Sequence, residues 1–151
     1  MFSIEAIMST NLITLSPSAT LAEARTLMHE HRIHHLPVLD GDKLIGLISL
    51  TNVLAATDSF LRDDGSRIHA DEIDITDAMV TDVATVDVSA SLRHAALFLE
   101  KHKIGCLPVM DNEDLVGIIT DTDFVAVAIN LLEQIEETEP VVEDYDEVDV
   151  A

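Results

Sequence analysis

The sequence is poor in cysteine and in aromatic side chains. Its 151 residues include one cysteine, four phenylalanines, one tyrosine and no tryptophan, although 48% of the residues are apolar. The single cysteine, Cys106, excludes a disulfide bond within the chain and is typical of a protein in a reducing compartment. We therefore expect a core of packed leucine, isoleucine, valine and alanine side chains.

The sequence also lacks long apolar runs. No stretch approaches the ~20 apolar residues that a membrane-spanning helix needs. The N-terminus has neither the basic region nor the apolar segment of a secretory signal peptide. We therefore expect a cytoplasmic protein that has no membrane partner.

Basic side chains are scarce, because eight lysines and arginines stand against 29 aspartates and glutamates, a net charge of −21. Nucleic acids and anionic lipids bind to clustered lysine and arginine, so this charge excludes both as partners. A phosphorylated ligand must then be small and held by local hydrogen-bond donors. Nine acidic residues and no basic ones lie within residues 133–151, and we interpret this segment as a solvated, partly disordered tail.

The sequence does contain an internal repeat with an offset of 71 residues. An ungapped comparison of residues 4–54 with 75–125 gives 18 identical pairs among 51. Chance gives about three or four, at typical residue frequencies of ~5–8%. Two copies of one supersecondary unit predict a pseudo-symmetric pair in which each copy covers the apolar face of the other. Ligand sites in such pairs commonly lie where the copies meet.

The sequence of each copy predicts a short helical turn, which is followed by strands and helices in the order β-α-β-β-α. The turns are expected at residues 4–8 and 75–79, and the first extended segments at 11–15 and 83–87. Apolar residues three and four positions apart then predict one amphipathic helix per copy. These residues are Leu21, Ala24, Leu27 and Met28 in the first copy, and Leu92, Ala95, Ala96 and Leu99 in the second. Two short strands follow, at 36–39 and 43–48 in the first copy, and the second helix is clearest over 123–135.

These elements predict an α/β (α+β) fold in which the two copies are related by a pseudo-twofold axis, with their sheets packed together and the helices outside. The expected boundaries are 1–54 for the first copy, 55–74 for a connecting segment, 75–132 for the second copy and 133–151 for the acidic tail. We expect one shared core, in which strand residues of the two copies touch: Val38 or Ile48 against Val109 or Ile119.

The step from the last strand of each copy into its second helix carries the polar groups best suited to a ligand. Residues 46–52 (GLISLTN) and 117–123 (GIITDTD) place hydroxyl side chains and free backbone N–H groups at a helix N-terminus, which attracts anions. The carboxylate of Asp123 only accepts hydrogen bonds, so it would repel a phosphate and suits the paired hydroxyls of a ribose. The alternative is that Ser49, Thr120 and Asp123 are only helix caps. The occurrence of the pattern in both copies favours a binding role.

These motifs resemble those of the CBS domain, which occurs as tandem pairs, called Bateman modules, that bind adenosine-containing ligands. The matched motifs are Met-x-Thr near the start of each copy, Ile-x-x-Leu-Pro-Val-x-Asp, and Gly followed by two hydrophobic residues and Ser/Thr-x-x-Asp/Asn. They stand at residues 8–10, 33–40 and 46–52, and again at 79–81, 104–111 and 117–123. The resemblance covers about residues 2–130, so the chain is identified as a tandem CBS pair.

In this family each cleft combines the Ser/Thr-x-x-Asp step of one copy with the early strands of the other. The resemblance implies a main cleft, cleft A, formed by Met8, Thr10, Ile13, Ile33, His34, Ile118, Thr120, Thr122 and Asp123. It implies a weaker cleft, cleft B, formed by Leu47, Ser49, Thr51, Asn52, Met79, Thr81, Ala84, Ile104 and Gly105. Cleft A is favoured because it keeps the ribose-binding aspartate. It also has His34 at a position where nucleotide-sensing members place a histidine that contacts phosphate.

The resemblance implies a regulatory module and not an enzyme. Its possible ligands are AMP, ADP, ATP or S-adenosylmethionine, it requires no cofactor, and it would signal to an unknown partner protein. The residues agree, because we find no nucleophile–base pair, no metal-ligand spacing and no Walker-type lysine loop. The alternative function is a dimerisation or interaction scaffold that binds no ligand.

The resemblance also implies a homodimer, since pairs of this family usually stack through the helices that flank the clefts. The apolar helix faces supply such a surface, because their residues cannot all face one short sheet. These residues are Ala22, Ala24, Leu27 and Met28 in the first copy, and Ala95, Ala96 and Phe98 in the second.

Four histidines gather near the end of the first amphipathic helix, at positions 29, 31, 34 and 35. A metal site is one interpretation. Histidines at a helix end commonly complement the helix dipole, however, and no flanking pattern fixes a coordination geometry, so we expect no metal. Arg32 and His35 stand beside His34 and could add donors for a phosphate. We interpret Cys106 as a small core residue, with a reactive thiol as the alternative.

Overall fold

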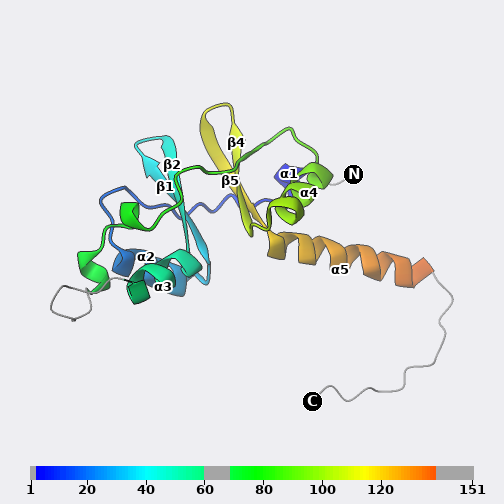
Figure 1. Ribbon diagram of the computed structural model, residues 1–151. Coiled ribbons are helices and arrows are strands. Elements are labelled where there is room, and N and C mark those ends of the chain that lie inside the picture. Colours follow the sequence, from blue (N-terminus) through cyan, green and yellow to red (C-terminus); the bar gives the residue numbers. More distant parts are fainter. Residues whose placement is uncertain (1–2, 60–68, 139–151) are drawn as a thin grey trace, which may run out of the picture.

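The computed structural model describes residues 3–59 and 69–138 (Figure 1). The first copy contains α1 (Ile4–Ile7), α2 (Leu21–His31), β1 (His35–Asp40), β2 (Lys43–Ser49) and α3 (Leu50–Ser59). The connecting segment contains the 3-10 turn η1 (Ala70–Glu72). The second copy contains the 3-10 turn η2 (Ile75–Asp77), β3 (Val86–Asp87), α4 (Leu92–His102), β4 (Cys106–Asp111), β5 (Asp114–Thr120) and α5 (Asp121–Thr138). The predicted α/β fold of two equivalent copies is confirmed.

The first long helix of each copy is fixed at both ends by equivalent residues. Helix α2 begins with a capping box, in which the Thr20 hydroxyl accepts from the Glu23 N–H and the Glu23 carboxylate accepts from the Thr20 N–H. Helix α4 begins at Ser91, whose hydroxyl accepts from the backbone of the first turn. Both helices have 11 residues and end at a left-handed residue, Arg32 or Lys103, each with a φ of 53°. The local sequence therefore gives α2 and α4 the same length and the same kind of ends.

The strands form one small sheet in each copy, with β1 paired to β2 in the first and the order β3-β4-β5 in the second. The two hairpins have the same register, because Val38 lies opposite Gly46 as Val109 lies opposite Gly117. The extended segment expected at residues 11–15 forms a single bridge, from Leu15 to Val38. The chain just before this segment bonds to the other copy, where Ser9 pairs with Ile118.

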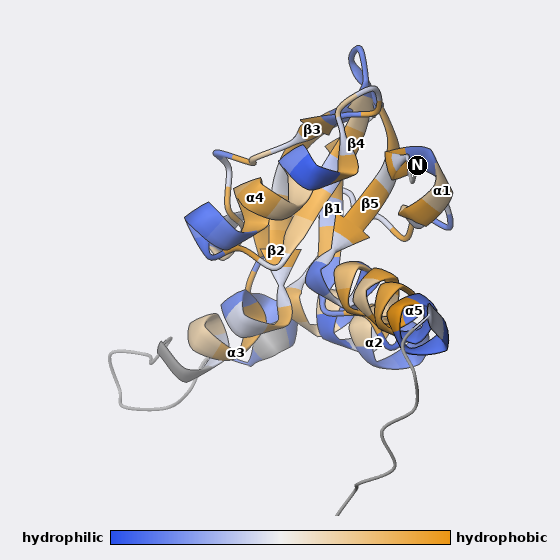
Figure 2. Cartoon of the chain, turned by 90° about the vertical axis from the view of Figure 1, so that its right-hand side faces the viewer, coloured by the Kyte–Doolittle hydropathy of each residue, from blue (hydrophilic) through white to orange (hydrophobic). Residues whose placement is uncertain are grey.

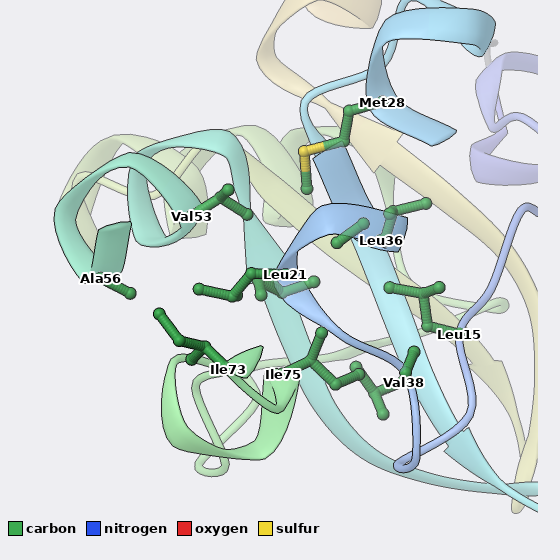
Figure 3. Packing of buried hydrophobic residues seen from close by; sticks show 12 residues of the cluster. Leu15, Leu21, Met28, Leu36, Val38, Val53, Ala56, Ile73 and Ile75 are labelled. Atoms are coloured by element: carbon green, nitrogen blue, oxygen red, sulfur yellow. The ribbon is translucent and has the colours of Figure 1, made fainter. Parts of the chain in front are cut away.

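The leading segment of each copy packs into the core of the other. Ile4 of α1 joins the cluster that is built on Val109 and Ile119, and it has no exposed surface. Ile75 of η2 joins the cluster of the first copy, and Figure 3 shows it beside Leu21 and Val38. Each copy therefore closes the core of its neighbour with one short segment.

The prediction of one core shared by the two copies is wrong. Val38 and Ile48 lie in one cluster, whereas Val109 and Ile119 lie in another, so the two copies keep separate cores. The sheets meet along β2 and β5. The turns that carry Ile4 and Ile75 have four and three residues, and each supplies one large side chain to the opposite core. The copies are joined in this way and their strand residues stay in separate clusters.

Two methionine–glycine contacts complete the junction. A Cβ atom built on Gly117 of β5 would overlap the sulfur of Met8, and one built on Gly46 of β2 would overlap the sulfur of Met79. Each contact joins the leading segment of one copy to the last strand of the other. The absence of a side chain at these two glycines lets the segments approach the strands.

The second helices run further than expected. Helix α3 includes residues 55–59 of the predicted connecting segment, and α5 includes residues 133–138 of the predicted tail. The extension carries one apolar side chain, Ile135, three residues after Leu132, and no proline interrupts the helix before residue 140. The rest of the expected tail, residues 139–151, lies outside the described residues. None of the described helices is long and apolar enough to cross a membrane.

The helices expose apolar side chains to different extents, and Leu54 of α3 and Leu97 of α4 are both exposed. Of the residues expected at a helical interface, Ala24, Met28 and Ala95 are buried and the others are half-buried. Helix α5 instead has no buried residue and projects away from the two sheets (Figure 1). Figure 2 shows the hydrophobic residues that it carries. They include Val125, Ile129, Leu131, Leu132 and Ile135, with exposed fractions between 43% and 57%.

Candidate functional site: two clefts between the copies

Two backbone pairings between the copies form the frame of the candidate site. The N–H and C=O of Ser9 both bond to Ile118 of β5, at 2.9 and 3.0 Å. In the equivalent place, Val80 and Leu47 of β2 bond at 2.9 Å in both directions. Each pairing brings the segment after a leading turn alongside the last strand of the other copy. One hollow opens beside each pairing.

Cleft A lies beside the Ser9–Ile118 pairing and encloses about 300 Å³, at the lower end of the range for small-molecule sites. Seven of the predicted residues line it: Ile13, Ile33, His34, Ile118, Thr120, Thr122 and Asp123. Met8 and Thr10 do not line it. Met8 packs against Gly117, and Thr10 stands in the sequence between the lining residues Ser9 and Asn11. The lining also includes Leu12, Arg32, His35, Pro37 and Asp121. Of these, the sequence indicated only Arg32 and His35.

The carboxylate of Asp123 has two roles available to it. Its Oδ2 accepts hydrogen bonds from the Thr120 N–H at 2.8 Å and from the Thr120 Oγ1 at 3.2 Å, which caps the start of α5. The Thr120 and Thr122 hydroxyls are also bonded to each other, at 2.8 Å. No residue of the described chain donates a hydrogen bond to the other oxygen, Oδ1. One carboxylate oxygen therefore caps the helix, and the other remains an acceptor beside cleft A.

The equivalent position of the first copy shows that the cap does not need a charge. The Oδ1 of Asn52 accepts from the Ser49 N–H at 2.9 Å and from the Ser49 hydroxyl at 2.8 Å. The Asn52 N–H in turn donates to the Ser49 hydroxyl at 3.1 Å. An asparagine thus caps α3 as Asp123 caps α5, but its oxygen is used in the cap and its remaining polar group is an NH₂ donor.

Cleft B lies beside the Leu47–Val80 pairing and encloses about 240 Å³. Six predicted residues line it: Leu47, Ser49, Asn52, Ala84, Ile104 and Gly105. Thr51 and Met79 do not, and Thr81 lines a separate hollow with Lys43 and Asp87. The sequence did not indicate the other lining residues, His35, Val80, Asp82, Val83 and Cys106. Cleft B is smaller than cleft A, and it has neither an arginine nor His34.

His35 lines both clefts. Its half-buried imidazole stands near Gly105, where an added Cβ would lie 3.4 Å from the His35 Cε1 and 3.5 Å from an Asp121 carboxylate oxygen. Burial lowers the pKa of His35 below its usual 6.5, and this effect outweighs the neighbouring Asp121, which raises it, while His34 lowers it further. At neutral pH the imidazole is uncharged and donates one hydrogen bond. The position of His35 in both clefts could not be predicted from the sequence, because it depends on how the two copies pack together.

Cys106 follows Gly105 into β4 and is buried. Burial, together with the nearby Asp121 and Asp123 carboxylates, raises the pKa of its thiol to about 12. The thiolate is the nucleophilic form of cysteine, so this thiol stays protonated and inert at neutral pH. The structure therefore favours the interpretation of Cys106 as a core residue. Among the described residues, no three histidine, cysteine, aspartate or glutamate side chains gather in a way that could hold a metal ion.

Comparison with known proteins supports the relation that the motifs indicated. A family model described as CBS domain matches residues 4–59 and 73–130. The crystal structure of a putative acetoin utilization protein (AcuB) from Vibrio cholerae is 43% identical, with a TM-score of 0.76 over 93% of this chain and 99% of the other. The CBS domain pair of protein MJ0100, in complex with 5′-methylthioadenosine and S-adenosyl-L-methionine, is 25% identical, with a TM-score of 0.76 over 87% of this chain and 98% of the other.

Curated relatives fall into two groups by length. The CBS domain-containing protein YhcV of Bacillus subtilis is 29% identical over 119 residues, which are 79% of this chain and 80% of the relative. A homoserine O-acetyltransferase of Methanocorpusculum labreanum is 32% identical, but the match spans 78% of this chain and 22% of the enzyme. The similarity to such enzymes is confined to a small part of their length.

Proposed function

This chain belongs to the CBS-domain family, and we propose that it is a regulatory module that binds an adenosine-containing ligand in cleft A. The observation that carries the proposal is the Asp123 carboxylate, which lines cleft A and has one oxygen that the helix cap leaves free. Such an oxygen accepts hydrogen bonds from the hydroxyls of a ribose. The complex of the MJ0100 pair with two adenosyl compounds supports this class of ligand.

The lining of cleft A suits the three parts of a nucleotide. Ile13, Ile33 and Ile118 provide a half-buried apolar surface for the adenine ring. Asp123, with the Thr120 and Thr122 hydroxyls beside it, binds the ribose. His34 is exposed at the same cleft and donates to a phosphate. We propose cleft B as a weaker site, because Asn52 has no free acceptor and Gly105 has no donor side chain.

We propose binding and signalling in place of catalysis. The one buried thiol is protonated at neutral pH, and the similarity to enzymes covers only a small part of their chains. A ligand regulates a partner protein when it binds one of two states more tightly than the other. The reducing environment that fits a single cysteine makes the cytoplasm the proposed location.

The exposed face of α5 favours a homodimer as the form in which the module works. Val125, Ile129 and Leu132 are spaced by four and three residues, so they lie on one face of the helix. Contiguous exposed apolar surface of this kind marks an interface between proteins. A dimerisation scaffold that binds no ligand is the second candidate function, and this same face is the observation that favours it.

A thermal-shift panel separates the two functions. The full chain is heated with adenosine, AMP, ADP, ATP or S-adenosylmethionine, and with uridine monophosphate as the control. A ligand at 100 times its dissociation constant adds about 2.7 kcal/mol of stability, so a bound adenosyl compound raises the melting temperature and the control does not. A folded preparation that responds to none of the adenosyl compounds would favour the scaffold.

A further inference from the structure

An apolar groove lies between the first turns of α4 and one face of α5, and it encloses about 800 Å³. We call it the α4–α5 groove. Leu92 and Ala96 of α4 line it together with Phe124, Val127 and Leu131 of α5. The three α5 residues are spaced three and four positions apart, so they share a face of the helix. The other lining residues are Ser3, Ser89, Ala90, Ser91 and Arg93.

The first copy has an equivalent groove between α2 and α3, and a segment of the chain fills it. Ile73 packs in one cluster with Leu21, Val53 and Ala56, and Figure 3 shows it beside Leu21 and Ala56. The turn η1, just before Ile73, packs against α2. As a result, Leu21 and Val53 have no exposed surface and Ala56 is buried.

The second copy leaves the equivalent apolar face open among the described residues. The counterparts of the buried Leu21, Val53 and Ala56 are Leu92, Phe124 and Val127, and all three are only half-buried. The counterpart of Ile73 is Phe2, which lies outside the described residues. No described turn packs against α4 as η1 packs against α2. The same pair of helices thus presents in the second copy a surface that a short segment covers in the first.

The segment that fills the first groove combines acidic and apolar side chains, because Asp71 and Glu72 of η1 precede Ile73. Residues 139–151 (EPVVEDYDEVDVA) have the same character, with six carboxylates, four valines and one tyrosine. None of the described residues that line the α4–α5 groove is acidic, although the chain has 29 aspartates and glutamates, and Arg93 is basic. The groove also begins at the N-terminus of α4, where the helix dipole favours negative charge. An acidic segment with apolar side chains therefore suits this groove.

The 139–151 segment is long enough to reach the whole groove. It begins where α5 ends, at Thr138, and Pro140 is a residue that does not continue a helix. At a rise of 1.5 Å per residue, Leu131 lies about 10 Å and Phe124 about 21 Å back along the helix axis from Thr138. Thirteen extended residues span up to about 43 Å. A segment that turns back at Pro140 can therefore pass along the α5 wall of the groove.

We propose that the 139–151 segment folds back along α5 and docks in the α4–α5 groove, in the place that η1 takes in the first copy. Its valines and Tyr145 pack on the apolar wall, and its carboxylates face Arg93 and solvent. The contact is made within one chain. It leaves the other face of α5, which carries Ile129 and Leu132, available to a second copy.

The intrinsic fluorescence of the full chain tests this contact, because Tyr145 is the only tyrosine and the chain has no tryptophan. Acrylamide, an uncharged quencher, measures how far solvent reaches Tyr145. Its quenching constant should be severalfold lower for the folded protein than for the protein unfolded in urea. Leu131→Glu places a carboxylate in the groove, and by repelling the acidic segment it should raise the constant to the value in urea.

Ile129→Glu is the matched control. It adds the same side chain to the same helix, at a residue that does not line the groove, and both positions are exposed enough to accept a glutamate. The control should leave the quenching constant of Tyr145 low, even if it separates two copies that associate through α5.

Three outcomes would overturn the proposal. The first is a quenching constant of the folded wild type that equals the value in urea; if Phe2→Ser then lowers it, Phe2 occupies the groove and excludes the 139–151 segment. The second is an equal response to Leu131→Glu and Ile129→Glu, which would show that Tyr145 is not held in the groove. The third is protection that disappears on dilution, which would place the segment on a second copy and not on its own chain.

Discussion

Replacing Asp123 with asparagine separates the two roles that this side chain has in the structure. As a cap, Asp123 accepts from the Thr120 N–H through Oδ2, and Asn52 makes the same contact to Ser49 with an amide oxygen. Asp123→Asn therefore keeps the cap. It turns the free acceptor, Oδ1, into an NH₂ donor, which cannot accept a hydrogen bond from a ribose hydroxyl.

The size of the two effects can be estimated separately. Hydrogen bonds to a charged group contribute about 1.5–3 kcal/mol, so Asp123→Asn should weaken binding of an adenosyl ligand roughly 10- to 100-fold. The free energy of unfolding should fall by only about 0.3–1 kcal/mol, because the first turn of α5 loses one negative charge near the helix dipole. Asp123→Ala should show the same loss of affinity and should lose the cap as well, at a cost of about 0.5–2 kcal/mol.

Calorimetry with the tightest adenosyl ligand measures the affinity, and urea unfolding without ligand measures the stability. Asn52→Ala is the matched control, since it removes the equivalent side chain beside cleft B and should change affinity little. Equal affinity of wild type and Asp123→Asn would refute the assignment of the ribose site, because the free oxygen would then contribute nothing. A large loss of stability in Asp123→Asn would refute the reasoning about the cap.

Three further predictions follow from the fold. Gly117→Ala should lower the free energy of unfolding, measured in urea, by about 1–3 kcal/mol, because the new methyl group overlaps with Met8. The same substitution should lower it less in a Met8→Ala background, and an equal loss in both backgrounds would exclude the contact. Burial lowers the folded-state pKa of His35, so its contribution to stability is present above pH 6.5 and is lost as the pH falls through the folded pKa. The free energy of unfolding of the wild type should therefore exceed that of His35→Asn by less at pH 5.5 than at pH 7.5. The same difference at both pH values would contradict this. Light scattering at micromolar concentration should show a dimer for the wild type and a monomer for Ile129→Lys/Leu132→Lys, whereas a monomeric wild type would rule out the α5 interface.

The repeat made most of the fold predictable from the sequence. Thr20 and Ser91, the apolar spacing after them, and the Leu-Pro-Val strands are local signals that appear twice, and the structure uses each in the same way. The exchange of leading segments was not predictable. Ile4 and Ile75 each stand in a turn of three or four residues, and so short a segment carries no signal of which core it covers.

The candidate site was predictable where its residues belong to motifs. Asp123, Thr120 and Ile118 lie in the strand-to-helix motif, and the structure brings them to cleft A. Met8 and Met79 belong to a motif as well, but they pack on glycines of the opposite strand. The place of His35 between the two clefts depends on how the copies meet, which no local pattern encodes.

The differences between the two copies are informative because the fold requires the same residues of both. Gly46 and Gly117 each admit a methionine, and Val38 and Val109 each occupy the centre of a core. At the clefts the copies diverge, with Asp123 against Asn52 and His34 against Gly105. Since Asn52 caps its helix as well as Asp123 does, the charge of Asp123 is not needed for folding. This divergence supports the proposal of one principal ligand in cleft A, because the free acceptor oxygen and His34 both line cleft A and not cleft B.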